Sequence, residues 1–377
     1  MKLKLFLFFF LAFFSLKHLA QTITTTDWQQ LVPSENLPLE IQARNSNNNL
    51  DLVKYRKRYY FAFRTAPLHF ASKKTKLYIV SSDDLKNWQY ETEFHMGNDL
   101  REPRFIIYHD TLFFYFFEGG KNIFKFQPRH VWATCFANGH WLQPKNMGMD
   151  GYVPWRIRER SDTLYLSAYY GVNLYKSTHS ADLRLFYSTN GLDWKKLSDE
   201  PQISGTGGEE GEFIFDKDGN LWGTVRLEGE GGIIVHAHKD SIGCWQKKHT
   251  PYKYDSALLF EHDDEIYLIS RRNLDGTAAK AWNWLPHPIR QKYNLLRYSF
   301  TNKKTALFRF NKEKMEIEWV MDFPSTGDTA FPAIAQYGKN SYALMNYSSD
   351  FNKRPKNWFS GQLGKTYIYW TVLSFDD

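Results

Sequence analysis

Residues 99–118 read DLREPRFIIYHDTLFFYFFE, and this stretch has the pattern of a β-hairpin. A charged turn with Pro103 leads into an apolar run, His109 and Asp110 mark a tight reversal, and the second run is dominated by aromatic residues. Similar two-strand units recur at residues 51–64, 153–170, 212–226, 256–272 and 330–348, each followed by a weaker pair of strands. Such repetition is typical of a repeat architecture.

The repeats predict an all-β fold, a β-propeller of about six four-stranded blades, with seven as the alternative count. The 377-residue chain is 42% hydrophobic and 18% aromatic, which suffices for one large core. Residues 22–31 are strand-like, and an N-terminal strand that completes the last blade would remove a free sheet edge. We therefore expect one propeller domain over residues 21–377, closed by its N-terminal strand, with residues 273–303 as a rim insertion that covers a ligand.

The N-terminus has the pattern of a signal peptide. Residues 1–4 supply positive charge, residues 5–16 are apolar, and Leu19-Ala20 offers a small-residue cleavage site. The apolar run is too short to span a membrane comfortably, and no second run of spanning length follows. Residues 1–20 therefore predict export to a periplasm or to the outside. Only two cysteines are present, so the fold does not depend on disulfides.

The net charge of +7 is spread along the chain. A nucleic-acid-binding protein usually concentrates its positive charge in one stripe or tail, and the sequence has none. We therefore expect an acidic glycan as partner, no nucleic acid and no membrane span. A generic basic surface explains the charge equally well.

Two similar turns close the third strands of successive repeats, at residues 81–88 (SSDDLKNW) and 187–194 (YSTNGLDW). They resemble the Asp-box of sialidase-type propellers, a structural turn. Residues 100–104 (LREPR), 183–191 (LRLFYSTNG) and 327–332 (GDTAFP) also resemble segments of secreted bacterial sialidase-like propellers. That family is similar to exo-sialidases and to propeller lyases that act on ulvan and other uronate polysaccharides.

The propeller topology gathers many polar side chains on one face. Arginine binds carboxylates through two parallel hydrogen bonds, so an arginine cluster favours a carboxylated sugar, while pairing between blades is the structural alternative. The substrate-binding residues predicted on this basis are Arg64, His69, Arg101, Arg104, Arg156, Tyr169, Glu212, Arg226 and Arg271.

Three functions remain open. The first is β-elimination on a uronate glycan by a lyase or dehydratase, with His130 and Tyr170 transferring protons and Arg184 stabilising the carboxylate, an arrangement that resembles propeller ulvan lyases. The second is sialidase-type hydrolysis, in which Glu212 supports Tyr254 or Tyr347, although the loop after Arg64 has no acidic residue. The third is glycan binding without catalysis.

No cofactor is required for any of these reactions. One group nevertheless suggests a structural zinc site: His236 and His238 alternate on one strand, and Cys244 and His249 follow. The spacing is not that of a standard zinc finger, so four unconnected side chains are the alternative interpretation.

Overall fold

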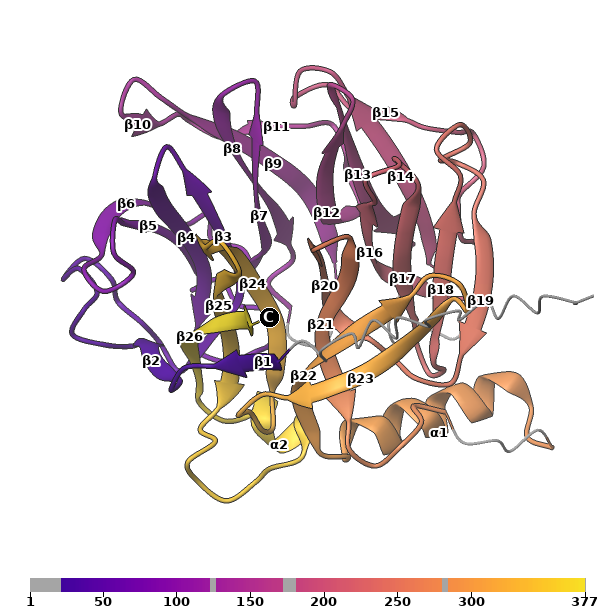
Figure 1. Ribbon diagram of the computed structural model, residues 1–377. Coiled ribbons are helices and arrows are strands. Elements are labelled where there is room, and N and C mark those ends of the chain that lie inside the picture. Colours follow the sequence, from indigo (N-terminus) through magenta and orange to yellow (C-terminus); the bar gives the residue numbers. More distant parts are fainter. Residues whose placement is uncertain (1–21, 123–126, 172–180, 280–283, 377) are drawn as a thin grey trace, which may run out of the picture.

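The computed structural model describes residues 22–122, 127–171, 181–279 and 284–376. In these ranges the chain forms six antiparallel β-sheets, arranged as the blades of a propeller (Figure 1). The predicted fold class is confirmed, and the count is six rather than seven. The predicted signal peptide, residues 1–20, lies outside the described residues and stays a prediction.

The first three blades follow one another along the chain. Blade 1 contains β3 (Ser46–Tyr55), β4 (Arg58–Ala66), β5 (Lys76–Ser82) and β6 (Gln89–Phe94). Blade 2 contains β7 (Leu100–Tyr108), β8 (Thr111–Gly119), β9 (Pro128–Ala137), β10 (His140–Trp141) and β11 (Lys145–Asn146). Blade 3 contains β12 (Tyr152–Arg160), β13 (Thr163–Tyr170), β14 (Asp182–Ser188) and β15 (Lys195–Lys196).

The last three blades continue this order. Blade 4 contains β16 (Gly208–Phe215), β17 (Leu221–Leu227), β18 (Gly232–Ala237) and β19 (Gln246–Thr250). Blade 5 contains β20 (Asp255–His262), β21 (Glu265–Asn273), β22 (Lys303–Asn311) and β23 (Glu316–Asp322). Blade 6 contains β24 (Thr329–Gly338), β25 (Ser341–Ser349) and β26 (Thr366–Asp376), joined by β1 (Thr22–Thr25) and β2 (Gln29–Val32).

Blade 6 closes the ring with both ends of the chain. Strand β1 pairs antiparallel with β26, from Thr22 opposite Asp376 to Thr25 opposite Leu373, and β2 pairs with the same strand further along. The N-terminal strand therefore covers what would otherwise be a free edge. This confirms the predicted closure.

The six first strands, β3, β7, β12, β16, β20 and β24, form the innermost ring. Each of them contacts the corresponding strand of both neighbouring blades. We call the end of this ring at which the six strands begin the mouth. The second strand of each blade runs antiparallel to the first and therefore ends at the mouth.

Packing between blades explains the aromatic run of β8. Phe114 and Phe116 belong to a core cluster with side chains of blade 1, whereas Phe113 and Tyr115 belong to a second cluster with side chains of blade 3. Successive side chains of a strand point to opposite faces, and both faces of this strand are buried. Continuous hydrophobicity in β8 is thus what a blade between two other blades requires.

The two Asp-box-like turns are built alike. Ser82 Oγ accepts hydrogen bonds from the Asp84 and Leu85 amides, and Asp84 Oδ1 accepts from the amides of Lys86 and Asn87. In the second copy Ser188 and Asn190 accept the equivalent amide hydrogen bonds. Both are structural turns, as predicted.

In the described residues two helices lie outside the repeat. Helix α1 (His287–Ser299) connects β21 to β22, inside the predicted insertion 273–303, and α2 (Trp358–Gln362) precedes β26. Asn294 of α1 donates to the Gly229 carbonyl at 2.9 Å, which fixes the helix to blade 4. No helix in the described part of the chain is long and apolar enough to cross a membrane.

Candidate active site

All six inner strands carry a β-bulge shortly after they begin. At five of these bulges a residue other than glycine adopts a φ of 40° to 66°: Asn49, Glu102, Glu210, Ser256 and Phe331. A left-handed conformation costs a non-glycine residue about 1–3 kcal/mol, and such strain gathers at functional sites. The repeated bulges therefore single out the mouth as the candidate site.

A cationic and aromatic layer lies beneath the mouth. The guanidinium of Arg104 packs over the rings of Trp155, at 5.0 Å, and Phe331, at 4.5 Å. All three side chains are buried. Burial lowers the pKa of Arg104 to about 10, so it stays charged at neutral pH.

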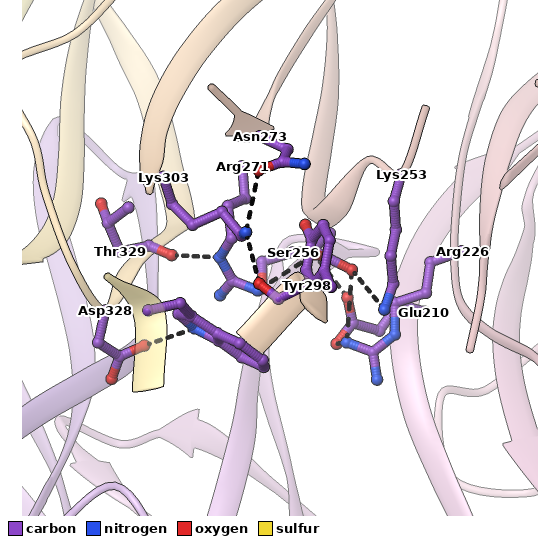
Figure 2. Close-up of polar contacts among 12 residues, drawn as sticks. Glu210, Arg226, Lys253, Ser256, Arg271, Asn273, Tyr298, Lys303, Asp328 and Thr329 are labelled. Carbon is purple, nitrogen blue, oxygen red and sulfur yellow. Dashed lines mark hydrogen bonds and ion pairs between the residues drawn. The ribbon is translucent and has the colours of Figure 1, made fainter. Parts of the chain in front are cut away.

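Arg226, at the end of β17, binds three carboxylates. Its guanidinium nitrogens lie 2.6 Å from Glu210, 2.5 Å from Glu209 and 2.8 Å from Glu228. Burial raises the pKa of Glu209 to about 7 and also raises the pKa of Glu210. Figure 2 shows Arg226 and Glu210 on one side of this polar cluster. The positive charge of Arg226 is therefore compensated by carboxylates of the protein itself.

Asp255, the first residue of β20, is a second centre of charge. Lys253 Nζ lies 3.5 Å from one carboxylate oxygen, Arg271 lies 3.3 Å from the other, and the Tyr298 hydroxyl donates to the latter. Burial opposes ionisation, but the neighbouring cations hold the pKa of Asp255 below its usual range. Lys303, buried against the Tyr298 ring at 3.6 Å, has its pKa lowered by burial to about 7 (Figure 2). Through Tyr298, α1 reaches into the mouth.

Asp328, just before β24, joins a histidine and a tyrosine. His69 Nδ1 lies 2.7 Å from Asp328 Oδ2, and the Tyr347 hydroxyl donates to Oδ1 at 3.0 Å. The Trp358 indole N–H, at 3.2 Å, also donates to Oδ1. Because the carboxylate accepts at Nδ1, we assign the proton of neutral His69 to that nitrogen, which leaves the Nε2 lone pair unprotonated.

The pKa shifts of this pair suit acid–base chemistry. Burial lowers the pKa of His69 despite the charge of Asp328, so the ring is neutral at pH 7. Burial and Asp328 raise the pKa of Tyr347 well above its usual value, so the phenol keeps its proton. One carboxylate thus holds a base and an acid side by side.

Arg101 lies next to this pair. Its Nη2 donates to the His69 carbonyl at 2.7 Å, and its Nε donates to Asp99 at 2.5 Å. Arg64 is fully buried behind it and binds the other oxygen of Asp99 at 2.7 Å. Arg101, with a side chain that is 15% exposed, is therefore open to a ligand, whereas Arg64 positions Asp99.

Glu102 is a buried carboxyl group with one oxygen that lacks a hydrogen bond in the described part of the chain and lies 3.9 Å from Arg104. Its Oε1 accepts from Asn49 at 3.1 Å, and its Oε2 has no hydrogen-bond partner among the described residues. Burial raises its pKa to about 7, and the charge of Glu210 adds to this while Arg104 opposes it. At neutral pH Glu102 is therefore protonated in about half of the molecules.

Several predicted substrate-binding residues lie between blades, and their role toward a substrate stays a prediction. Glu212 binds Arg156 of blade 3 at 2.6 Å and accepts the Leu259 amide of blade 5 at 3.1 Å. Among the described residues Glu212 forms no hydrogen bond with Tyr347, whose hydroxyl donates to Asp328, and Tyr254 packs in the core between blades 4 and 5. Arg64, Arg104, Arg156 and Glu212 are buried in these joints, whereas His69, Arg101, Tyr169, Arg226 and Arg271 lie at the mouth.

The predicted catalytic residues lie on the rim of blades 2 and 3. His130 Nδ1 is 2.7 Å from Asp150, and Tyr170, which is 49% exposed, packs against the following residue, Gly151. Arg184 donates to a backbone carbonyl of its own blade at 2.6 Å. The structure thus brings His130 and Tyr170 to one short segment, and their catalytic role stays a prediction.

The four predicted zinc ligands do not form a set. His236 stacks on Trp222 with ring centroids 4.1 Å apart, while His238 lies beside a neighbouring aspartate. His249 is paired with the residue three positions before His236, so it belongs to the opposite face of the sheet. Among the described residues no group of three or more His, Cys, Asp or Glu is arranged to hold a metal ion.

Several residues of the mouth were not predicted, among them Glu210, Asp255 and Tyr298. For Glu210, the available sequence signal was the pair of adjacent acidic residues, Glu209-Glu210, before an apolar strand. Tyr298 comes from the insertion, which the repeat pattern does not place.

No protein-family profile matches the chain, and no curated protein matches it in sequence. A Dyadobacter fermentans protein of unknown function shares its fold with a TM-score of 0.65 and 13% identity, over 94% of this chain and 99% of its own. The NanB sialidase of Streptococcus pneumoniae matches with a TM-score of 0.59 and 12% identity, over 89% of this chain and 69% of its own. The endosialidase of phage phi92 matches with a TM-score of 0.59 and 10% identity, over 95% of this chain and 69% of its own. The similarity to propeller lyases stays a prediction, and what these comparisons establish is the fold: a sialidase-like β-propeller.

Proposed function

We propose that the protein is a carbohydrate-active enzyme that cleaves an acidic glycan at the mouth by β-elimination across C4 and C5 of a uronate. The observation that carries this proposal is the pairing of His69 and Tyr347 on Asp328. Elimination needs one group that removes a proton and one that donates a proton, and it needs no carboxylate nucleophile. The sialidases that share the fold support a glycan as the substrate class.

The proposed reaction assigns one role to each group. Arg101 and Arg271, which both interact electrostatically with Tyr347, would bind the uronate carboxylate and make the C5 proton more acidic. His69 Nε2 would take that proton. The C5–H electron pair becomes the C4–C5 double bond, the C4–O4 bond breaks, and Tyr347 would give its proton to the leaving oxygen.

Hydrolysis of the sialidase type is the second candidate, and Glu102 favours it. The loop after Arg64 contains His69 and no acid for this reaction, but Glu102 has a pKa raised to about 7 and an Oε2 without a hydrogen-bond partner among the described residues. Against it stands Tyr347, whose raised pKa makes it a poor nucleophile. Glycan binding without turnover is the third candidate.

The first experiment follows absorbance at about 235 nm, where a conjugated enol-ether acid absorbs, while the purified protein is incubated with uronate polysaccharides, their oligosaccharides and sialosides. The variants His69→Ala and Tyr347→Phe are compared with His109→Ala, which changes an exposed histidine paired with Asp162. We expect at least a hundredfold loss in the first two variants and none in the third.

The remaining outcomes are equally decisive. Unchanged absorbance together with release of free sialic acid establishes the hydrolase. No product from any substrate leaves glycan binding without catalysis as the remaining candidate. If His130→Ala and Tyr170→Phe abolish turnover while His69→Ala does not, the reaction belongs to the rim of blades 2 and 3, and our site assignment is wrong.

A further inference from the structure

A basic pocket of about 350 Å³ opens beside the mouth on blade 1. Three connecting segments form it: the chain before β3, the β4–β5 connection and the β6–β7 connection. Its lining consists of Arg44, Lys73, Lys74, Lys76, His95 and Gly97. All three segments lie at the end of the blade at which β3 begins, so the pocket shares a face with the mouth.

The charge of this pocket is not neutralised by the protein. Lys76 forms an ion pair with Glu93 at 2.8 Å, but among the described residues none is found for Arg44, Lys73 or Lys74. This contrasts with the mouth, where Arg226 alone contacts three carboxylates. Three uncompensated cations around one cavity attract an anionic group.

A continuous set of contacts links the pocket to the mouth. His95 Nδ1 donates to the Thr75 carbonyl at 2.9 Å, and the Thr75 hydroxyl donates to Asp99 at 2.7 Å. Asp99 holds Arg101, which in turn donates to the His69 carbonyl. His69 and Lys73 lie on the same connection four positions apart, a separation that spans at most about 14 Å.

We propose that this pocket is an anion subsite, which binds a carboxylate or sulfate group of an extended acidic glycan. Its lysine ammonium groups are flexible point charges that accept either anion, unlike a bidentate arginine site. This inference rests on the proposed function, in which the reacting uronate lies at the mouth. The rest of the glycan would then extend outward over blade 1. The pocket would therefore select long acidic chains over single sugars.

Calorimetric binding tests the subsite without any need for turnover. The probes are dextran sulfate, polygalacturonate and neutral dextran, added to the intact protein and to the double variant Lys73→Glu/Lys74→Glu. The matched control is Lys195→Glu/Lys196→Glu, another pair of adjacent exposed lysines with the same change in net charge. We expect at least one polyanion to bind, neutral dextran not to bind, a tenfold or greater loss in the pocket variant and less than twofold in the control. Binding should weaken with added salt.

The polyanion that binds identifies the group, sulfate or carboxylate. Equal losses in the two double variants, or none in either, would overturn the inference, as would equally tight binding of a DNA duplex. Loss of binding in the pocket variant, combined with no product from any glycan, would keep the subsite and reject the proposed function. If turnover occurs, the pocket variant should raise KM and leave kcat unchanged.

Discussion

Single residues at the mouth owe their properties to burial and to the charges around them. Asp328 stays ionised because it accepts hydrogen bonds from several donors, and its charge fixes both the tautomer of His69 and the proton of Tyr347. Glu102 is buried equally deeply but receives only one hydrogen bond, so its pKa rises instead. Two buried carboxyl groups near the mouth thus differ at neutral pH: Asp328 is ionised, whereas Glu102 is protonated in about half of the molecules.

The raised pKa of Glu102 makes stability depend on pH. The native state favours the protonated acid, so this contribution is fully present below the unfolded pKa of about 4.5 and is lost as pH rises through about 7. We expect Glu102→Gln to increase the free energy of unfolding at pH 8, relative to the native protein, by on the order of 1–3 kcal/mol more than at pH 5. Urea denaturation at both pH values measures this. Glu35→Gln, an exposed control, should show no such difference, and parallel profiles for Glu102→Gln would contradict the assignment.

At the scale of elements, the bulges and the blade faces decide what the sequence reveals. Strand β8 could be predicted residue by residue because both its faces are hydrophobic. Strand β16 begins four residues before its predicted start at residue 212, and β20 begins one residue before its predicted start at residue 256. The bulges cause this difference because they interrupt the alternation on which strand prediction depends. Those same bulges present Glu210 and Ser256, so the mouth was the part of the fold hardest to predict.

Side-chain pairing was equally hidden. The sequence predicts a cluster of arginines, and most of them do lie at or below the mouth. Whether an arginine binds a substrate or a carboxylate of the next blade depends on contacts between residues tens of positions apart, such as Arg156 with Glu212. No local pattern encodes such a contact.

The alternating packing of β8 can be tested at Phe114. This ring is fully buried and contacts Phe94, Phe105 and Trp141 between blades 1 and 2. Phe114→Ala should lower the free energy of unfolding by about 3–5 kcal/mol in urea denaturation. Tyr337→Ala, at a half-exposed position of β24, should change it by about 0.5 kcal/mol or less. A loss below about 1 kcal/mol at Phe114 would show that the two blades are not packed as described.

At the scale of the whole molecule, the ring is closed only by noncovalent contacts. The hydrogen bonds between β1 and β26 join the two ends of the chain, and the Asn47 amide donates to Thr366 at 2.9 Å between blades 1 and 6. Such closure leaves no exposed edge on β26.

Deletion of residues 22–26 should expose that edge. We expect a lower free energy of unfolding and faster hydrogen exchange across residues 371–376 of β26, whose partner strand is gone. Strand β19, at the outer edge of blade 4, provides the internal control and should exchange at an unchanged rate. Unaltered protection of β26 would mean that β1 does not contribute to closure.

The contact between His69 and Asp328 has a further consequence. His69 belongs to blade 1, while Asp328 and Tyr347 belong to blade 6, so the proposed acid–base pair spans the joint at which the ring is sealed. Turnover by this pair would therefore depend on the contact between blades 1 and 6. If the proposed function holds, a proteolytic cut or a partial opening that separates blade 6 from blade 1 would abolish turnover while the other blades stay folded, and the loss would precede global unfolding.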